Sequence, residues 1–370
     1  MDNPFLIRST DPSKSDYLTP DCSVNKIRLA KLPIYGIEDD IEGCTVKEIF
    51  SVKCVVEEIK KNAEKLGIDP KLYEGVKGKN LPLILVQKVE DNENPETAKL
   101  AREIIEKFGS RLGLMLLTLK MGEPENRKAR PEWTEAHWNY WAQVKDIILV
   151  GGLASGTFGA IMREQINQVF AMHGTEPYNI LLYDNSQQVA VLGCASCIRE
   201  ENGVFVVMDF GQTNIKRSFV VKCDGEVTDM KILPSYPSKY MEWNVPDDFE
   251  RVRQAKALHR YLMNAIENTY KEAERTSGLP GNEIIISIAS YTVDGVLNHA
   301  RSGYAKLCEL GSCYAEVLGY ELSGILKRDI SVKLIHDGTA VALNFKSRDN
   351  TVCLAVGSYF GVGFPETRIV

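Results

Sequence analysis

An aspartate followed by a glycine and small polar residues ends an apolar stretch of the chain near residue 209. The run 204–209 predicts a strand ending in Asp209, and a glycine lets the next turn approach a ligand closely. Backbone N–H groups in such a turn bind anions, and an aspartate can hold a hydrated Mg²⁺. Asp209 is thus the candidate metal ligand, and the candidate phosphate-binding residues are Gly211, Gln212, Thr213 and Asn214. An ordinary hairpin turn is the alternative.

A second aspartate, Asp337, directly follows the predicted strand 332–336 and precedes Gly338 and a helix that begins at Thr339. Ligands of α/β sheets bind at the carboxyl ends of the strands, where this side chain is expected. Asp337 is therefore the candidate catalytic residue. An aspartate near a helix N-cap, which is common, is the alternative.

Two glycine-containing turns also follow apolar runs. The run 146–150 leads into Gly151 and Gly152, where a flat nucleoside can lie against the backbone. The run 351–356 leads into a turn whose backbone donors can surround a phosphate. Its candidate residues are Gly357, Ser358, Gly361 and Gly363.

The composition restricts the classes of protein to which the chain can belong. With 370 residues, 44% apolar and 25% charged, it is typical of a soluble globular protein of two domains or two similar lobes. A net charge of −6 argues against nucleic-acid binding through phosphate contacts. Because the first residues are polar, we expect no signal peptide, and the apolar stretches fall short of the about 20 residues that a membrane span needs. Nine cysteines without a secretion signal suggest reduced thiols. We expect a cytoplasmic protein with no membrane and no nucleic-acid partner.

Strands alternate with helices along the chain, which predicts an α/β fold. Asp224-Gly225 between two alternating runs indicates a hairpin, so a meander over residues 204–232 makes the sheet mixed. The apolar run 81–88 predicts a further strand. Long helices are expected at about 94–119 and 248–277, the second ended by Gly278.

In combination, these segments resemble the superfamily of sugar kinases, hexokinase, actin and heat-shock chaperones, and most of all the ROK and hexokinase-type sugar kinases. The resemblance implies two ribonuclease H-like lobes with mixed five-stranded sheets flanked by helices, and an ATP cleft between them. It gives each motif a role: 209–213 is the first phosphate motif, 336–340 the catalytic helix motif, 357–363 the second phosphate motif, 151–152 the adenosine motif and 189–195 the closing helix.

The order of these motifs departs from the family order, because the adenosine motif and the closing helix precede the first phosphate motif. A circular permutation explains this order. Residues 1–200 would then be the permuted part of the second lobe, 201–348 the first lobe and 349–370 the start of the second lobe. A separate α/β domain at residues 1–200 is the rival interpretation.

The resemblance implies an ATP-dependent sugar kinase. Asp337 would be the general base, Asp209 would hold Mg²⁺ through water, and the glycine turns would hold ATP. Candidate sugar contacts in the loop after Asp294 are Asn298, Arg301, Ser302 and Tyr304. The zinc and Glu-x-Gly-His motifs of ROK kinases are absent, so neither zinc nor glucose specificity is implied. His336 stands where asparagine is common in the family.

Two other functions remain open. The first is an iron–sulfur ATPase activator of the same superfamily, for which Cys194 and Cys197 would be the ligands, although close packing in a small-residue helix also explains this pair. The second is a non-catalytic sugar or nucleotide sensor. The sequence also leaves a homodimer open.

Overall fold

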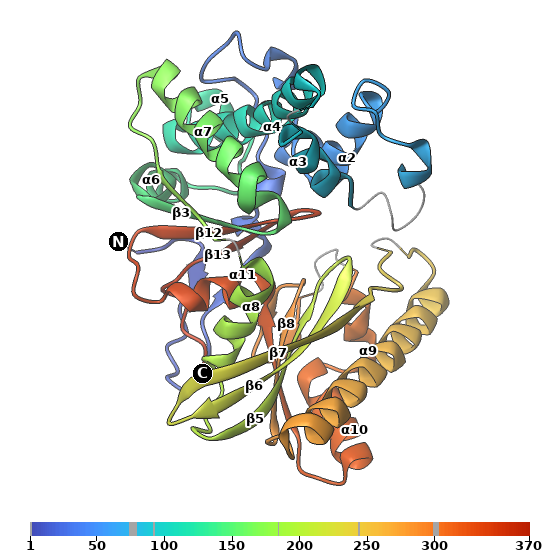
Figure 1. The fold of residues 1–370 in the computed structure, drawn as a ribbon. Coiled ribbons are helices and arrows are strands. Elements are labelled where there is room, and N and C mark those ends of the chain that lie inside the picture. The colour runs from blue at the N-terminus through green and yellow to red at the C-terminus, as the bar shows by residue number, and fades with distance from the viewer. Residues whose placement is uncertain (1, 74–79, 92, 184, 243–244, 299–302) are drawn as a thin grey trace. The chain divides into compact units, whose positions relative to one another are not determined.

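The computed structural model describes residues 2–73, 80–91, 93–183, 185–242, 245–298 and 303–370 (Figure 1). The chain forms two compact units, and each is assembled from three segments. Unit 1 comprises Met1–Pro4, Ser23–Ser186 and Asn350–Val362, and unit 2 comprises Phe5–Cys22, Gln187–Asp349 and Gly363–Val370. The boundaries differ from the expected ones, because Phe5–Cys22 and the expected closing helix group with unit 2.

A five-stranded mixed sheet forms the centre of unit 2, in the order β11-β8-β5-β6-β7. The central strand β5 pairs in parallel with β8 and antiparallel with β6, which pairs antiparallel with β7, while β11 pairs in parallel with β8. This is the strand order and direction of a ribonuclease H-like sheet. The bounds are β5 (Gly203–Phe210), β6 (Asn214–Cys223), β7 (Glu226–Pro237), β8 (Glu283–Ile288) and β11 (Ser331–His336).

The two faces of this sheet carry different partners because side chains alternate along a strand. One face buries Val206 and Met208 of β5 with apolar residues of α9 (Asp248–Ser277) and α10 (Tyr314–Leu326), which makes the main core of the unit. On the other face, Lys222 Nζ donates to the carbonyl of Ile198, just after α8 (Ser186–Ala195). The short helix α11 (Asp337–Ala342) continues directly from β11.

The sheet of unit 1 has the order β13-β12-β3-β4. The structure places four strands in it among the described residues, where five were expected. Strand β12 pairs in parallel with β3, which pairs in parallel with β4, so residues near 350 complete a sheet that begins near residue 146. Residues 1–200 therefore do not form a domain by themselves. The bounds are β3 (Asp146–Val150), β4 (Asn179–Leu182), β12 (Thr351–Val356) and β13 (Phe360–Gly363).

Two long helices of unit 1 pack closely through glycines. A Cβ at Gly109 of α4 (Pro95–Met121) would lie 2.7 Å from Gln165 Cβ of α7 (Gly156–His173), and one at Gly113 would lie 3.0 Å from Val169 Cβ. The Asn94 side chain accepts from Thr97 N–H and fixes the start of α4, while Gly122 in the left-handed region ends it. The other helices are α2 (Val52–Lys61), α3 (Leu81–Val89) and α6 (Glu135–Gln143).

The strand expected at 81–88 is wrong, because this segment forms helix α3. Short apolar runs do not distinguish a strand from a buried helix, and Pro82 fits the first turn of a helix. Short α-helices and strands are α1 (Val46–Ile49), α5 (Pro124–Lys128), β1 (Leu6–Ile7), β2 (Tyr17–Leu18), β9 (Thr292–Val293) and β10 (Val296–Leu297). Within the described ranges, no helix has both the length and the apolar composition needed to cross a membrane.

Helix α8 depends on the absence of a side chain at one position. A Cβ at Gly193 would lie 1.8 Å from the carbonyl oxygen of Ala340 in α11, whereas a Cβ at Gly324 in α10 would meet nothing within 4 Å. We therefore predict that Gly193→Ala lowers the free energy of unfolding by about 1–3 kcal/mol, because the two backbones must separate. The matched change Gly324→Ala should raise it by about 0.5–1 kcal/mol, as alanine does in a helix. Chemical denaturation of both variants checks this, and equal effects would contradict the packing of α8 on α11.

Candidate functional site

The carboxyl ends of three parallel strands of unit 2 meet at one edge of its sheet. Asp209 of β5 lies in register with Ser287 of β8, and the adjacent residue Ile288 lies in register with His336 of β11. Asp337 follows His336 directly as the first residue of α11. The strand pairing therefore brings both predicted aspartates to the same edge of one sheet.

Asp209 is nearly buried and is held by two donors. Its side chain is 9% exposed, Lys216 Nζ lies 2.7 Å from Oδ2, and the Ser287 hydroxyl donates to Oδ1 at 2.9 Å. The carboxylate of Asp209 raises the pKa of Lys216, so this lysine stays charged. The site therefore contains a fixed cation beside the first aspartate.

The side chain of Asp337 is partly buried, with 34% of its surface exposed. Its own neighbour Gly338 donates a backbone N–H to Oδ1 at 2.7 Å, and His336 Nε2 lies 3.2 Å from the same oxygen. Burial, with a contribution from the charge of Asp209, raises the pKa of Asp337. A carboxylate with a raised pKa is a better proton acceptor, as a general base requires.

The turn after β5 is fixed by hydrogen bonds to the backbone carbonyl of Gly211. Gly211 O accepts hydrogen bonds from the Tyr304 hydroxyl at 2.8 Å and the Ser238 hydroxyl at 2.7 Å. Gln212 Nε2 donates to Ala289 O at 3.0 Å, and Gly211 N–H donates to Asn214 O at 3.0 Å. Gly211, Gln212 and Thr213 are half-buried and Asn214 is exposed, so the tip of the turn is accessible.

The candidate turns of unit 1 differ in how much space they leave. A Cβ at Gly151 would lie 2.1 Å from Val356 O, and its φ of +117° also favours glycine, whereas a Cβ at Gly152 would meet nothing within 4 Å. Gly151 thus lets the end of β3 approach β12, and Gly152 faces open space. In the other turn, Gly357 O accepts from Val52 N–H at 3.1 Å, and Ser358 and Gly361 are half-buried beside it.

Gly363 has a packing role. A Cβ there would lie 1.9 Å from the carbonyl oxygen of Gly338, so this glycine lets its own backbone lie against the start of α11. Gly363 is buried, which does not favour the predicted contact with a phosphate.

The four predicted sugar contacts have different outcomes. Arg301 and Ser302 lie outside the described residues, and Asn298 is exposed. The prediction that Tyr304 contacts a sugar is wrong, because this residue is fully buried, stacks on Phe210 and donates to Gly211 O. It is part of the support of the turn, since a buried ring cannot contact a sugar.

Cys194 and Cys197 are both buried, at the end of α8 and just after it. Burial raises the pKa of both thiols, whereas a metal ligand must be a thiolate. Within the described part of the chain, no group of three or more His, Cys, Asp or Glu residues could hold a metal ion. Burial of both thiols is consistent with close packing of a helix of small residues.

Sequence reasoning missed several residues that support the site. Ser287 is a polar residue within an otherwise apolar strand, and this pattern could have indicated a buried hydroxyl group. Ser238 and Tyr291 come from loops, and nothing in their local sequence indicated a contact with Gly211 or a stack on His336.

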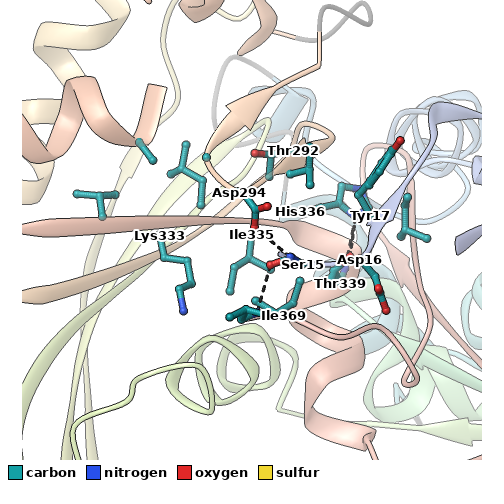
Figure 2. Close-up of a pocket in the computed structure, with 17 residues that line it drawn as sticks. Ser15, Asp16, Tyr17, Thr292, Asp294, Lys333, Ile335, His336, Thr339 and Ile369 are labelled. Carbon is teal, nitrogen blue, oxygen red and sulfur yellow. Dashed lines mark hydrogen bonds between the residues drawn. The ribbon is translucent and has the colours of Figure 1, made fainter. Parts of the chain in front are cut away.

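A cavity of about 200 Å³ lies in unit 2 beside the site (Figure 2). Its walls include His336, Thr339, Asp294 and Ser15, and Ser15 N–H donates to Asp294 Oδ1 at 3.3 Å. Asp337 is not among its lining residues, so the cavity has no assigned part in the chemistry.

No family model and no curated protein matches the chain. Among solved structures, it is similar to the ethanolamine utilization protein EutJ from Carboxydothermus hydrogenoformans, with 12% identity over 62% of this chain and 73% of that one, at a TM-score of 0.29. An exopolyphosphatase from Cytophaga hutchinsonii shows 16% identity over 49% and 51%, at a TM-score of 0.26. The Ppx/GppA phosphatase of Aquifex aeolicus shows 12% identity over 70% and 87%, at a TM-score of 0.28. Such low TM-scores do not establish a shared fold.

The raised pKa of Asp337 has a consequence for stability. The Asp337 carboxyl stays protonated to higher pH in the folded protein than in the unfolded chain. Its ionised form therefore destabilises the fold, and this effect is complete above the pKa of the folded protein. We predict that Asp337→Asn is more stable than the wild type at neutral pH. The difference should vanish as pH falls below the ordinary aspartate value of 3.8. Denaturant unfolding between pH 3 and pH 8 measures this, with Asp229→Asn, an exposed change in β7, as the control. A stability difference that does not depend on pH would contradict it.

Proposed function

We propose that the protein is an ATP-dependent phosphotransferase of the sugar kinase and actin superfamily, and that it transfers the γ-phosphoryl group to a hydroxyl of a sugar-like acceptor. The observation that carries this proposal is the pair of carboxylates, Asp209 and Asp337, at the ends of parallel strands of one sheet, with Lys216 beside them. A fixed cation and a carboxyl of raised pKa suit a reaction that needs charge stabilisation and a proton acceptor.

Asp337 is the general base in this mechanism. The acceptor oxygen attacks the γ-phosphorus while its proton passes to Asp337, and the bond from the γ-phosphorus to the bridging oxygen of ADP breaks. Phosphoryl transfer needs little covalent work from the protein, so positioning and charge dominate. Lys216 is placed to offset the negative charge of the phosphates, because it remains protonated beside Asp209.

The residues around Asp209 fit a hydrated Mg²⁺. An ionised carboxylate offers about four lone-pair positions, and Lys216 and Ser287 use two of them. Mg²⁺ keeps several of its waters and is often held through them. Mg²⁺ bound there would neutralise phosphate charge, and Asp209 would orient its water ligands.

The glycine turns supply the remaining contacts with the nucleotide in this proposal. In unit 2, the turn at Gly211–Asn214 offers backbone donors to phosphates. In unit 1, the turn at Gly357–Gly361 also offers backbone donors, and Gly152 leaves space for a nucleoside. The parallel pairing of β12 with β3 supports the circular permutation, because it joins the segment after residue 349 to a sheet formed by earlier residues.

The acceptor is proposed to be a small sugar or polyol, and the exposed residue Asn298 is its candidate contact. A nucleotide sensor without catalysis is the competing function, and the buried thiols of Cys194 and Cys197 give the iron–sulfur activator no support.

Turnover tests the proposed function. ADP release from Mg-ATP should depend on one of a panel of hexoses, amino sugars, pentoses and polyols. Asp337→Asn should lower kcat by about 10²- to 10⁴-fold, because general base catalysis contributes roughly that factor. Nucleotide affinity, measured by calorimetry, should change little. Nucleotide binding without acceptor-dependent turnover would favour the sensor, and an Asp337→Asn variant of full activity would exclude this base.

The neighbouring glycines of unit 1 provide a matched test of nucleoside binding. Gly152→Ala should leave thermal stability unchanged, since its methyl group enters open space, but should weaken ATP binding by about tenfold or more by occupying that space. Gly151→Ala should instead lower the melting temperature, because its Cβ would collide with Val356 O. Unaltered ATP affinity in Gly152→Ala would place the nucleoside elsewhere.

A further inference from the structure

We propose that His336 is the positioning residue of Asp337: it donates its Nε2–H to Oδ1 and leaves Oδ2 as the atom that accepts the proton. This inference rests on the proposed function for its catalytic consequence. The contact itself stands on the geometry of the end of β11.

The tautomer of His336 follows from its neighbours. The backbone N–H of Thr339 points at Nδ1 at 3.4 Å, so Nδ1 is an acceptor and the ring proton is on Nε2. Nε2 lies 3.2 Å from Asp337 Oδ1. Burial lowers the pKa of His336, which keeps the imidazole neutral near pH 7. A neutral ring in this tautomer is a donor to Asp337.

The ring of His336 is held in one orientation. It is 7% exposed and stacks on Tyr291, with 4.5 Å between ring centroids and an angle of 11° between planes. Tyr291 lies three residues after β8, the central of the three parallel strands, so the stack ties the loop after β8 to the end of β11. Figure 2 shows His336 and Thr339 together at the wall of the neighbouring cavity.

Both donors to Asp337 use the same oxygen. Gly338 N–H reaches Oδ1 at 2.7 Å and His336 reaches it at 3.2 Å, while Oδ2 has no partner in the part of the chain that the structure describes. Two donors on one oxygen fix the plane of the carboxylate and stabilise its charge. The other oxygen is left to take the proton of the acceptor hydroxyl.

The charged groups Asp209 and Lys216 and the hydrogen-bond donor His336 act on Asp337 in opposite directions. Asp209 of β5 raises its pKa, while Lys216 of β6 and His336 of β11 lower it. Removing the donor from His336 while Asp209 and Lys216 remain should therefore raise the pKa of Asp337.

Two substitutions separate the two roles of His336. His336→Asn keeps an amide oxygen near the position of Nδ1, where it still accepts from Thr339, but it is too short to reach Asp337. His336→Gln carries an amide nitrogen close to the position of Nε2 and restores the donor. The Asn variant therefore controls for the helix start, and the Gln variant is the conservative rescue.

The first measurement is a ¹³C NMR titration of the Asp337 carboxyl in the full-length protein, assigned by its loss in Asp337→Asn. We expect the pKa of Asp337 to rise in His336→Asn and to return toward the wild-type value in His336→Gln. A titration curve that is the same in His336→Asn and in the wild type would overturn the positioning role.

The second measurement is the pH profile of kcat with Mg-ATP and the acceptor found for the wild type. His336→Asn should lower kcat by about tenfold with an unchanged KM for ATP, and its acid limb should move to higher pH. His336→Gln should recover most of the rate. Loss of rate without movement of the acid limb, or with a raised KM for ATP, would mean that His336 is only structural. A wild-type protein without turnover would refute the proposed function, and the carboxyl titration would still decide the contact.

Discussion

The close backbone contact at helix α11 is the constraint on which the rest of unit 2 depends. Gly193 of α8 approaches the carbonyl of Ala340, and Gly363 at the end of β13 approaches the carbonyl of Gly338. A Cβ at either glycine would lie within 2 Å of a backbone oxygen. Helix α11 has only six residues, so it is positioned by these contacts and by its strand more than by its own helical stability. Because Asp337 is its first residue, the same contacts position the carboxylate.

The charges of the site are arranged around that fixed carboxylate. Asp209 is nearly buried and forms an ion pair with Lys216, so their charges offset each other. Among the described residues, Asp337 has no lysine or arginine partner: it is held by a backbone N–H and by a neutral imidazole, and it keeps a raised pKa. Two carboxylates in one site with different environments are suited to different tasks, one to binding and one to proton transfer.

The sequence was most informative where a residue type has few physical explanations. The Asp224-Gly225 turn predicted the meander of β5, β6 and β7, and the apolar runs predicted that Asp209 and Asp337 lie at strand ends. That the two strand ends share one edge follows from the strand pairing alone. The apolar run at 81–88 was ambiguous, because burial of a short helix and of a strand require the same residues. The support of Gly211 by Tyr304 and Ser238 could not be predicted, since it depends on loops distant in sequence. The sheet of unit 1 has four strands among the described residues, where five were expected, because no local sequence pattern shows how many strands will pair.

The proposed function requires transfer of a phosphoryl group to an acceptor hydroxyl. The most direct measurement is ³¹P NMR of a mixture of the protein, Mg-ATP and the candidate acceptors. The account predicts a phosphomonoester signal that grows in step with ADP, with little inorganic phosphate. Inorganic phosphate as the sole product, or unchanged ATP in the presence of every acceptor, would contradict it.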